Sequence, residues 1–547
     1  RVMLGSMMDT PLLISSLMDH AEKNFPEQEI VSVVADSPDY RYTFQDAFRR
    51  TRQLANALQS LGIELGDRVG TLAWNDHRHF ELYYAISCSG AICHTVNPRL
   101  FPEQLVYIIN HAEDRVMFCD PMFVPLLENI QDQLEFIEHV IVLTSEEHMP
   151  SSSLSNLLCY ETLIAGESSE YEWPKFDEKT ASAMCYTSGT TGNPKGVLYN
   201  HRSTILHAYA AALPDVFGIS ASDSILPIVP MFHVNAWGTI YSGPLCGSKI
   251  VLPGSKMGDG ETLQRLIESE QVTVSQGVPT VWLALLAYLE ESGKQIHSLK
   301  RVITGGAACP AVIAQEMQEK HDVYVHVAWG MTEMSPLGTY NQFKPGMEDL
   351  EGDELLEAQL KAGRGVYGVE MKITDDENNE LPWDGVAFGS LKVRGPWVLS
   401  DYFKAEPGST LEEDGWFETG DVATIDKRGF MAITDRTKDV IKSGGEWISS
   451  IDLENTATNH PKVAEAAVIG VNHPKWTERP LLLVQAKDGE ELSKDEILQW
   501  YEGKVAKWWI PDDVVFVESL PHTATGKIQK FELRKTYKDH QLPDIDT

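Results

Sequence analysis

The sequence contains no long hydrophobic run, since no stretch approaches the roughly 18 uninterrupted apolar residues that can span a bilayer. Basic residues are also few. There are 45 Lys and Arg against 80 Asp and Glu, so the formal net charge is −35 with neutral His. Nucleic-acid backbones attract Lys and Arg, so this balance argues against a nucleic-acid partner. Residues 1–8 lack an apolar stretch after a basic one, and we therefore expect no secretion signal.

Cysteines are few and scattered. The seven of them form no Cys-x-x-Cys pair, and their number is odd. This pattern indicates buried thiols in a reducing compartment, not disulfides or a zinc site. We therefore expect a cytoplasmic protein without an integral membrane segment. Acidic residues gather at 348–357 and 375–377, where a metal site is conceivable; a solvated loop and a turn are the favoured interpretation.

The 547 residues, 43% of them hydrophobic and 23% charged, predict a globular chain with several structural units. Hydrophobic spacing predicts helices over 44–61 and 80–91 and strands over 68–73, 116–119 and 139–143. The middle of the chain repeats this strand–helix alternation. Such repetition predicts an α/β fold with two open sheets packed together.

The pattern changes towards the C-terminus. From about residue 385 short strands and turns indicate a β-rich subdomain, and a compact α/β module follows residues 435–436. We predict an N-terminal domain over 1–435, with the β-rich subdomain over about 385–435. A hinge over 436–442 would lead into a small α+β C-terminal domain over 443–547.

The most informative motif is the segment 186–197, YTSGTTGNPKGV, which follows a strand-like run. Its glycines allow a tight turn that brings backbone N–H groups towards an anion. The hydroxyl groups add donors, and Lys195 adds a positive charge. The spacing does not fit a Walker A loop. We interpret the segment as a phosphate-binding loop in preference to a polar surface turn.

This loop resembles the phosphate loop of the acyl-adenylate-forming superfamily, which includes acyl-CoA synthetases, peptide-synthetase adenylation domains and beetle luciferases. Further segments match family motifs in the same order, so the resemblance covers nearly the whole chain. They are 305–308 (GGAA), 329–333 (WGMTE), 416–421 (WFETGD), 435–445 (DRTKDVIKSGG) and 521–527 (PHTATGK). Residues 400–403 (SDYF) depart from the family, which more often has Gly before Tyr402. Asp401 tolerates turns, so we expect no loss of activity.

The resemblance implies that the chain binds ATP and AMP, with Glu333 as a ligand of Mg²⁺, a hard cation that prefers oxygen. Thr332 would contact the α-phosphate and Asp421 the ribose hydroxyls. The implied nucleotide-binding residues are Thr187, Ser188, Gly189, Thr190, Thr191, Gly192, Lys195, Gly305, Gly306, Ala307, Ala308, Trp329, Gly330, Met331, Thr332, Asp421, Arg436 and Lys527.

Forming an acyl-adenylate joins two anions, a carboxylate and a phosphate. A lysine that contacts both would offset their repulsion in the transition state, and the resemblance gives this role to Lys527. The implied catalytic residues are Lys527, Lys195, Thr187, Glu333, His233 and Lys442. The C-terminal domain is expected to be mobile, with Lys438 as the pivot. In its second orientation it would bind CoA through Lys442, Ser443, Gly444, Gly445, Glu446 and Trp447.

The segment 230–237, PMFHVNAW, resembles the family's acyl pocket. His233 stands where enzymes for α-amino acids carry an Asp that pairs with the ammonium group, which argues against amino-acid substrates. The implied pocket residues are His233, Val234, Trp237, Val278, Pro279 and Gly305. Bulky aromatic groups there favour short or medium acids.

The resulting expectation is an ATP- and Mg²⁺-dependent acyl-CoA synthetase for a small carboxylic acid, with 3-methylmercaptopropionate as a candidate. A medium- or long-chain fatty-acid–CoA ligase and a luciferase-like or carrier-loading adenylating enzyme are alternatives within the fold. A catalytically inactive nucleotide-binding regulator is the alternative from another class. A homodimer is left open.

Overall fold

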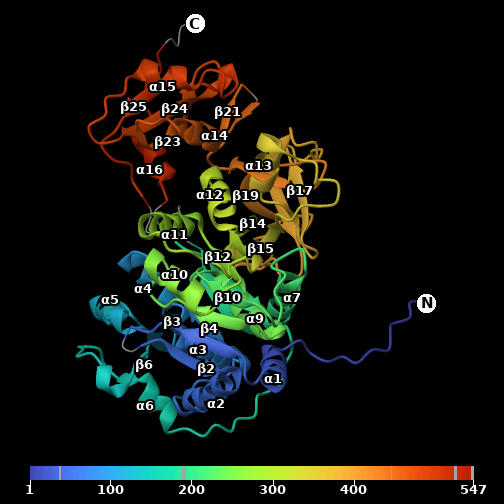
Figure 1. The fold of residues 1–547 in the computed structure, drawn as a ribbon, viewed down its shortest axis with the longest axis vertical. Helices are drawn as coiled ribbons and strands as arrows, with labels where there is room; N and C mark the ends of the chain where they lie inside the picture. Colours follow the sequence, from blue (N-terminus) through green and yellow to red (C-terminus); the bar gives the residue numbers. More distant parts are fainter. Residues whose placement is uncertain (36–37, 188–192, 445, 523–526, 544–547) are drawn as a thin grey trace. The chain divides into compact units, whose positions relative to one another are not determined.

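The computed structural model describes residues 1–35, 38–187, 193–444, 446–522 and 527–543 (Figure 1). These residues divide into two compact units. Unit 1 comprises residues 1–187, 194–370 and 394–411, and unit 2 comprises the described part of 188–193, 371–393 and 412–547. The two large sheets of the chain belong to unit 1.

The first large sheet has the order β7-β6-β5-β3-β4-β8-β9, and its strands are parallel except for the antiparallel pair β8 and β9. Its strands are β3 (Arg68–Leu72), β4 (Ile92–Thr95), β5 (Val116–Cys119), β6 (His139–Val142), β7 (Leu157–Cys159), β8 (Ala181–Tyr186) and β9 (Gly196–Asn200). The α/β sheet predicted from strand–helix alternation is therefore mostly parallel in the structure.

The second large sheet has the order β16-β15-β14-β13-β12-β10-β11-β1-β2. Its centre, from β1 through β11, β10, β12 and β13 to β14, is parallel. Its strands are β1 (Glu29–Ser32), β2 (Tyr40–Thr43), β10 (Ser224–Pro227), β11 (Lys249–Leu252), β12 (Val274–Gly277), β13 (Arg301–Thr304), β14 (Tyr324–Gly330), β15 (Leu337–Tyr340) and β16 (Arg364–Gly365). The prediction of two α/β sheets is confirmed.

Helices pack on both large sheets (Figure 1). The α-helices of unit 1 are α1 (Ile14–Asn24), α2 (Phe44–Ser60), α3 (His77–Cys88), α4 (Pro102–Ala112), α5 (Val124–Ile130), α6 (Tyr160–Ala165), α7 (His201–Ala212), α8 (Val234–Trp237), α9 (Thr239–Cys246), α10 (Gly260–Ser269), α11 (Pro279–Ser292), α12 (Ala311–His321) and α13 (Gly352–Leu360). Short 3₁₀ turns are η1 (Pro121–Phe123), η2 (Gln131–Gln133), η3 (Glu146–His148), η4 (Thr332–Met334) and, in unit 2, η5 (Lys507–Trp509).

Helix α2 illustrates how local sequence sets the ends of an element. The Thr43 side chain accepts from the Asp46 backbone, and the Asp46 side chain accepts in return from Thr43, which forms a capping box. The helix ends before Gly62, whose φ of +82° suits glycine. The predicted helix over 44–61 is confirmed within one residue.

The acidic stretch 348–357 is a correction to the expected loop, because it enters helix α13 at Gly352. Asp353 and Glu354 lie in the first turn, where negative charge complements the helix dipole. Within the described residues, no group of three or more His, Cys, Asp or Glu could hold a metal ion, so the conceived metal site does not form there.

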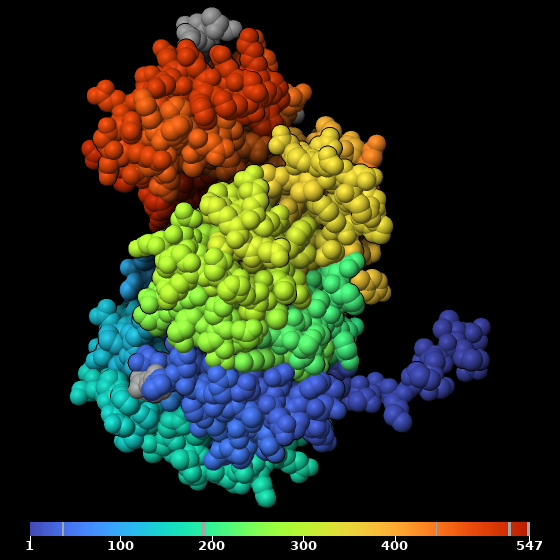
Figure 2. Space-filling view, viewed as in Figure 1, coloured from blue at the N-terminus to red at the C-terminus, as the bar shows by residue number. Residues whose placement is uncertain are grey.

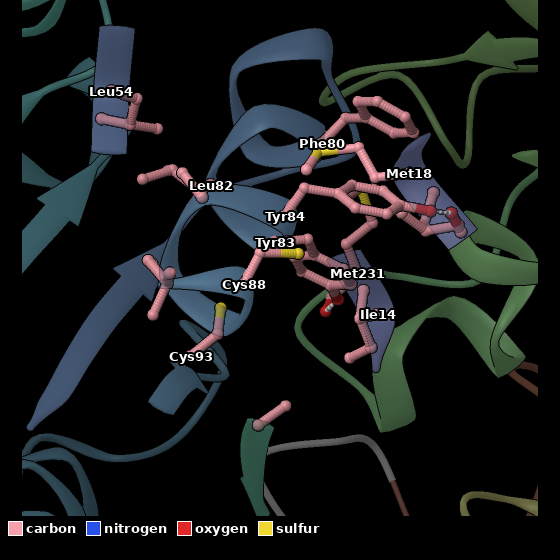
Figure 3. Packing of buried hydrophobic residues seen from close by; sticks show 14 of the residues in the cluster. Ile14, Met18, Leu54, Phe80, Leu82, Tyr83, Tyr84, Cys88, Cys93 and Met231 are labelled. Carbon is pink, nitrogen blue, oxygen red and sulfur yellow. Dashed lines mark hydrogen bonds between the residues drawn. The ribbon is translucent and has the colours of Figure 1, made fainter. Parts of the chain in front are cut away.

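Helix α3 is buried along its whole length and provides the centre of a large core. Phe80, Tyr83 and Tyr84 pack with Ile14 and Met18 of α1, as Figure 3 shows. Aromatic side chains bury large areas and so dominate the packing of such a core.

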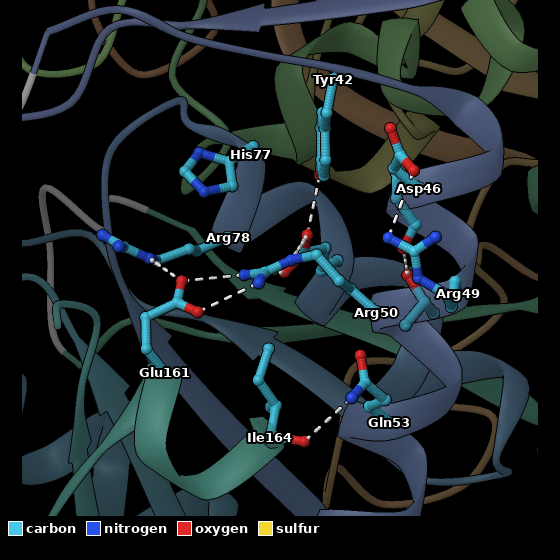
Figure 4. Close-up of polar contacts among 12 residues, drawn as sticks. Tyr42, Asp46, Arg49, Arg50, Gln53, His77, Arg78, Glu161 and Ile164 are labelled. Atoms are coloured by element: carbon cyan, nitrogen blue, oxygen red, sulfur yellow. Dashed lines mark hydrogen bonds and ion pairs between the residues drawn. The ribbon is translucent and has the colours of Figure 1, made fainter. Parts of the chain in front are cut away.

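A charged network crosses the same region (Figure 4). Glu81 is fully buried and accepts from Tyr42 at 2.8 Å and from Arg50 at 2.8 Å. Glu161 pairs with both Arg50 and Arg78. Two carboxylates thus balance two guanidinium groups, which is the condition for burying charge without a large penalty.

Unit 2 holds two smaller sheets. The first has the order β17-β18-β19-β20, with β17 (Glu370–Thr374), β18 (Phe388–Arg394), β19 (Phe417–Ile425) and β20 (Met431–Arg436). The second has the order β22-β21-β24-β23, with β25 on β24, and consists of β21 (Ile441–Ser443), β22 (Glu446–Ile448), β23 (Val463–His473), β24 (Thr477–Ala486) and β25 (Asp513–Phe516). Helices α14 (Ser450–Thr458), α15 (Lys494–Trp500) and α16 (Lys530–Thr536) complete the unit.

All seven cysteines carry free thiols, and six of them are buried. Burial raises the pKa of the Cys309 thiol to about 12.

In the described ranges, every helix is too short or too polar to cross a bilayer.

Candidate active site

The two ends of the predicted phosphate loop are joined at the β8–β9 hairpin in unit 1. The Thr187 N–H donates to the Lys195 carbonyl at 2.8 Å, and the Lys195 N–H donates to Thr187 Oγ1 at 3.0 Å. The Lys195 side chain is exposed. The predicted residues Ser188, Gly189, Thr190, Thr191 and Gly192 lie outside the described residues. These two hydrogen bonds join Thr187 and Lys195 at the base of the loop, which we call its neck. The exposed Lys195 ammonium lies beside it.

The carboxyl ends of three parallel strands, β12, β13 and β14, lie side by side, with Thr304 between Gly277 and Val327. Gly305 follows β13 and is buried. A Cβ there would lie 2.9 Å from the Ala328 carbonyl and 3.2 Å from the Trp237 ring. The close packing thus requires glycine. The predicted adenine contacts Gly306, Ala307 and Ala308 are exposed just beyond the strand end, the edge at which open α/β sheets bind ligands.

The segment WGMTE runs from the end of β14, through Trp329, Gly330 and Met331, into the η4 turn. Thr332 and Glu333 are both buried. The backbone of this turn is tied down by two bonds: Tyr199 Oη donates to the Thr332 carbonyl at 2.7 Å, and the Leu399 N–H donates to the Glu333 carbonyl at 2.9 Å.

The Glu333 carboxylate accepts from Tyr402 Oη, with 2.7 Å between Oε2 and the phenol oxygen. A single well-held carboxylate suits Mg²⁺, because this ion is commonly bound by one or two carboxylates plus substrate phosphates. A resident metal would need a larger set of protein ligands, which the described part of the chain does not bring together. Glu333 therefore fits a magnesium ion that arrives with a nucleotide.

The predicted acyl segment adopts a left-handed turn. Val234, Asn235, Ala236 and Trp237 have φ values of 47°, 51°, 51° and 57°, and Gly238 follows at 74°. Left-handed backbone costs about 1–2 kcal/mol for each residue with a Cβ. Tyr83 Oη donates to Asn235 Oδ1 at 3.3 Å and helps to hold the turn. Strain of this kind is typical of ligand sites.

The structure brings several predicted pocket residues together. Trp237 lies against Gly305, and Val278 lies 3.1 Å from the Cβ position of Gly306. Pro279 is buried directly after Val278 at the start of α11. His233 is exposed at the beginning of the left-handed turn.

The sequence prediction missed Gln276 on β12. Its side chain shares a sheet face with Val274 and Ile303, which pack in one cluster with Trp237. Gln276 is fully buried, and within the described residues neither Nε2 nor Oε1 has a hydrogen-bond partner. An unsatisfied buried group costs about 1–3 kcal/mol, so we expect a ligand or a water to contact this amide. The sequence did carry a signal for this residue, since Gln276 is a large polar side chain within the strand-like run VTVSQGV.

In unit 2, the predicted ribose contact Asp421 lies beside Arg436, the first residue of the predicted hinge. Asp421 on β19 pairs in register with Arg436 at the end of β20, and Arg436 Nε lies 3.4 Å from Asp421 Oδ1. Asp421 is buried, whereas Arg436 is exposed. The arrangement offers a held carboxylate next to a guanidinium group.

Lys527 belongs to the same cluster. Its side chain reaches the surface, but the surrounding protein removes water from the ammonium, which lowers its pKa; Arg436 lowers it further, while Asp421 raises it. The pKa of Lys438 is also lowered, first by loss of water and then by Arg436, Arg534 and Lys527, against the raising effect of Asp439. Like charges gathered in this way favour a bound anion.

The predicted CoA-binding face begins on strand β21. Lys442 Nζ lies 3.1 Å from Asp376 and 5.2 Å from the Trp447 ring. Ser443 is buried and accepts from Arg479. Gly444 has a φ of +58°, and Glu446 is exposed. Gly445 lies outside the described residues.

Comparison with known proteins adds to this geometry. A model of the AMP-binding enzyme family matches residues 18–403, and one of the AMP-binding enzyme C-terminal domain matches residues 452–527. The 3-methylmercaptopropionyl-CoA ligase of Ruegeria lacuscaerulensis is 52% identical over 537 residues, with 98% of this chain and 99% of the relative covered.

The medium-chain-fatty-acid–CoA ligase of Ectopseudomonas oleovorans is 50% identical, with 98% of each chain covered. Among solved structures, an anthranilate CoA ligase in complex with anthranoyl-AMP is similar with a TM-score of 0.81. Its sequence is 27% identical, and the match covers 97% of this chain and 98% of that one.

Proposed function

Since the chain belongs to the family of AMP-binding enzymes, we propose that it is an acyl-CoA synthetase that consumes ATP with Mg²⁺ and CoA. The observation that supports the proposal is the ion pair of Asp421 with Arg436, whose charges both act on the Lys527 ammonium. A carboxylate for the ribose and two cations for phosphate and acid oxygens are the groups that adenylation requires.

In the first step, a carboxylate oxygen of the acid attacks the α-phosphorus, and the bond to pyrophosphate breaks. Thr187 and Lys195 hold phosphate oxygens, and Lys527 offsets the repulsion between the two anions. Glu333 would hold Mg²⁺, which would supply positive charge to neutralise the phosphates. The buried backbone of the η4 turn keeps the Glu333 carboxylate in one place.

In the second step, the CoA sulfur attacks the acyl carbonyl, and AMP leaves. We assign the thiol approach to the face formed by Lys442, Ser443, Gly444, Gly445, Glu446 and Trp447. A C-terminal domain over 443–547 would present this face after turning at a hinge over 436–442, with Lys438 as the pivot and residues 1–435 as the partner domain.

For the acid, we propose a short or medium carboxylic acid, with 3-methylmercaptopropionate as the first candidate. Two relatives support this class by their names. We assign to the acid pocket Trp237, which packs against Gly305, and the Gln276 amide, which has no partner among the described residues. A medium- or long-chain fatty-acid–CoA ligase is the second candidate; the relative from Ectopseudomonas oleovorans, named for medium-chain acids, supports the medium-chain part of it.

Replacing Gln276 by leucine should change the choice between acids of equal shape. 3-Methylmercaptopropionate and pentanoate differ by one sulfur in place of a methylene group, and an amide N–H can donate to sulfur. We expect the ratio of kcat/KM for the sulfur acid over pentanoate to fall about two- to tenfold, the worth of one neutral hydrogen bond. Steady-state assays with both acids measure it.

The matched comparison is His233→Ala at the exposed start of the turn, which should alter preference for chain length and leave the sulfur-to-methylene ratio less affected. An unchanged ratio in Gln276→Leu would remove this amide from the acid contacts.

Pyrophosphate release separates the functional alternatives. An acyl-CoA synthetase releases AMP in a CoA-dependent manner after pyrophosphate. A carrier-loading or luciferase-like enzyme forms adenylate without using CoA, and an inactive regulator binds ATP without releasing pyrophosphate.

We further propose a homodimer in the cytoplasm. Residues before Leu12 run out from unit 1 as an extended arm, shown in deep blue in Figure 2. Its apolar side chains Val2, Met3, Leu4, Met7 and Met8 are 86–93% exposed. Such exposure of large apolar groups favours docking on a second copy. The free, buried thiols support a reducing compartment.

Removing residues 1–10 should therefore convert a dimer into a monomer. The arm is anchored to unit 1 from Leu12 onward, where the Leu12 N–H donates to Glu178 at 2.8 Å, so the body should fold without it. Light scattering of both forms at matched concentrations measures the change, and a monomeric full chain would refute the dimer.

A further inference from the structure

Residues 399–404 connect two parts of the unit 1 site that are distant in sequence. The Leu399 N–H donates to the Glu333 carbonyl at 2.9 Å, and the Phe403 N–H donates to the Gly196 carbonyl at 2.9 Å. Gly196 directly follows Lys195. The segment therefore ties the neck of the phosphate loop to the turn that carries the magnesium ligand.

Tyr402, in the middle of this segment, contacts both charged groups through different parts of its side chain. Its hydroxyl donates to Glu333 Oε2 at 2.7 Å, and the centre of its ring lies 5.0 Å from Lys195 Nζ. One side chain therefore contacts both the carboxylate and the ammonium.

We propose that Tyr402 is a positioning residue that orients the Glu333 carboxylate with its hydroxyl and the Lys195 ammonium with its ring. The inference rests on the proposed function, because it assigns the two charged groups to metal and phosphate. A hydrogen bond to one oxygen fixes the orientation of the Glu333 carboxylate. Residues that hydrogen-bond to metal ligands commonly orient them in this way. The ring face attracts the ammonium without neutralising its charge.

The turn around Tyr402 is built to hold it. The Tyr402 N–H donates to Thr410 Oγ1 at 3.3 Å, and Asp401 accepts from the Gly408 N–H at 3.2 Å. Asp401, which departs from the family pattern, thus has a local role in closing the turn. The Phe403 ring packs on His111, which further restrains the segment.

Two variants separate the hydroxyl from the ring. Tyr402→Phe keeps the ring beside Lys195 and removes the donor to Glu333, whereas Tyr402→Leu removes both. The readout is calorimetric binding of α,β-methylene-ATP at a series of Mg²⁺ concentrations, together with thermal unfolding of each protein.

For Tyr402→Phe we expect the Mg²⁺ concentration that gives half-maximal binding to rise about tenfold, with little change in affinity at saturating Mg²⁺. For Tyr402→Leu we expect the same rise, plus a loss of about two- to fivefold in affinity at saturating Mg²⁺, from the missing ring. In a Glu333→Gln background, Tyr402→Phe should add no further shift, because the carboxylate that the hydroxyl orients is already absent.

Tyr209→Phe on α7 is the matched control, since it removes a phenol from a side chain that is 57% exposed. It should bind as the wild type does. Unchanged Mg²⁺ dependence in Tyr402→Phe overturns the proposal, and so does a variant that fails to fold, which would give the hydroxyl a role in folding. A wild-type protein that binds no ATP analogue would instead refute the proposed function.

Discussion

The Lys527→Ala variant is expected to lose acyl-adenylate formation by about 100- to 1,000-fold, the range seen when one preorganised electrostatic group is removed. Lys527 lies beside Arg436 and Asp421, where loss of water and a neighbouring cation lower its pKa. The expected loss follows if this ammonium contacts both the carboxylate and the phosphate in the transition state. Acid-dependent exchange of labelled pyrophosphate into ATP measures the step.

The same variant should still convert supplied acyl-AMP to the CoA thioester, since the second step joins a neutral acyl carbonyl to a thiol. The Lys527 side chain reaches the surface and adds positive charge to a basic cluster. Its removal should therefore leave thermal unfolding unchanged. Lys538→Ala, an exposed lysine beyond α16, controls for a general loss of charge. Adenylation at the wild-type rate would refute the assignment.

Sequence patterns predicted the fold best where local signals agree. The capping box at Thr43 and the glycine at position 62 define α2, and continuous apolar runs define β5 and β6. Helix α3 was predicted three residues late at both ends, because it is buried on every side and therefore lacks polar periodicity. Its start depends on the Asp76 side chain, which accepts from the His79 N–H.

Candidate site residues could be named from sequence where short motifs carry charged or glycine residues, as with Lys195, Glu333 and Asp421. The left-handed turn over 234–237 was not, because Val and Ala disfavour that backbone and contacts from Tyr83 hold it. Gln276 and Tyr402 were also not predicted. Their proposed roles rest on the unpartnered amide of Gln276 and on the bond from Tyr402 to Glu333, a residue distant in sequence.

The Lys438→Pro variant is expected to spare adenylation and to slow thioester formation by about 100-fold, comparable to the loss from misplaced reacting groups. Lys438 follows β20 in the segment where the Val440 N–H donates to the Arg436 carbonyl at 2.9 Å. Proline fixes φ near −65° and removes a backbone donor. If the C-terminal domain turns at this residue, a fixed φ holds it in one orientation.

Lys438→Ala distinguishes the backbone from the charge. It removes the ammonium from the cluster with Arg436 and Lys527 but leaves φ unrestricted, so it should form thioester faster than the proline variant. Rapid-quench measurement of both half-reactions, with acyl-AMP supplied for the second, separates the steps. Equal losses of both steps in Lys438→Pro would contradict a pivot, since a fixed orientation can serve one step and not the other.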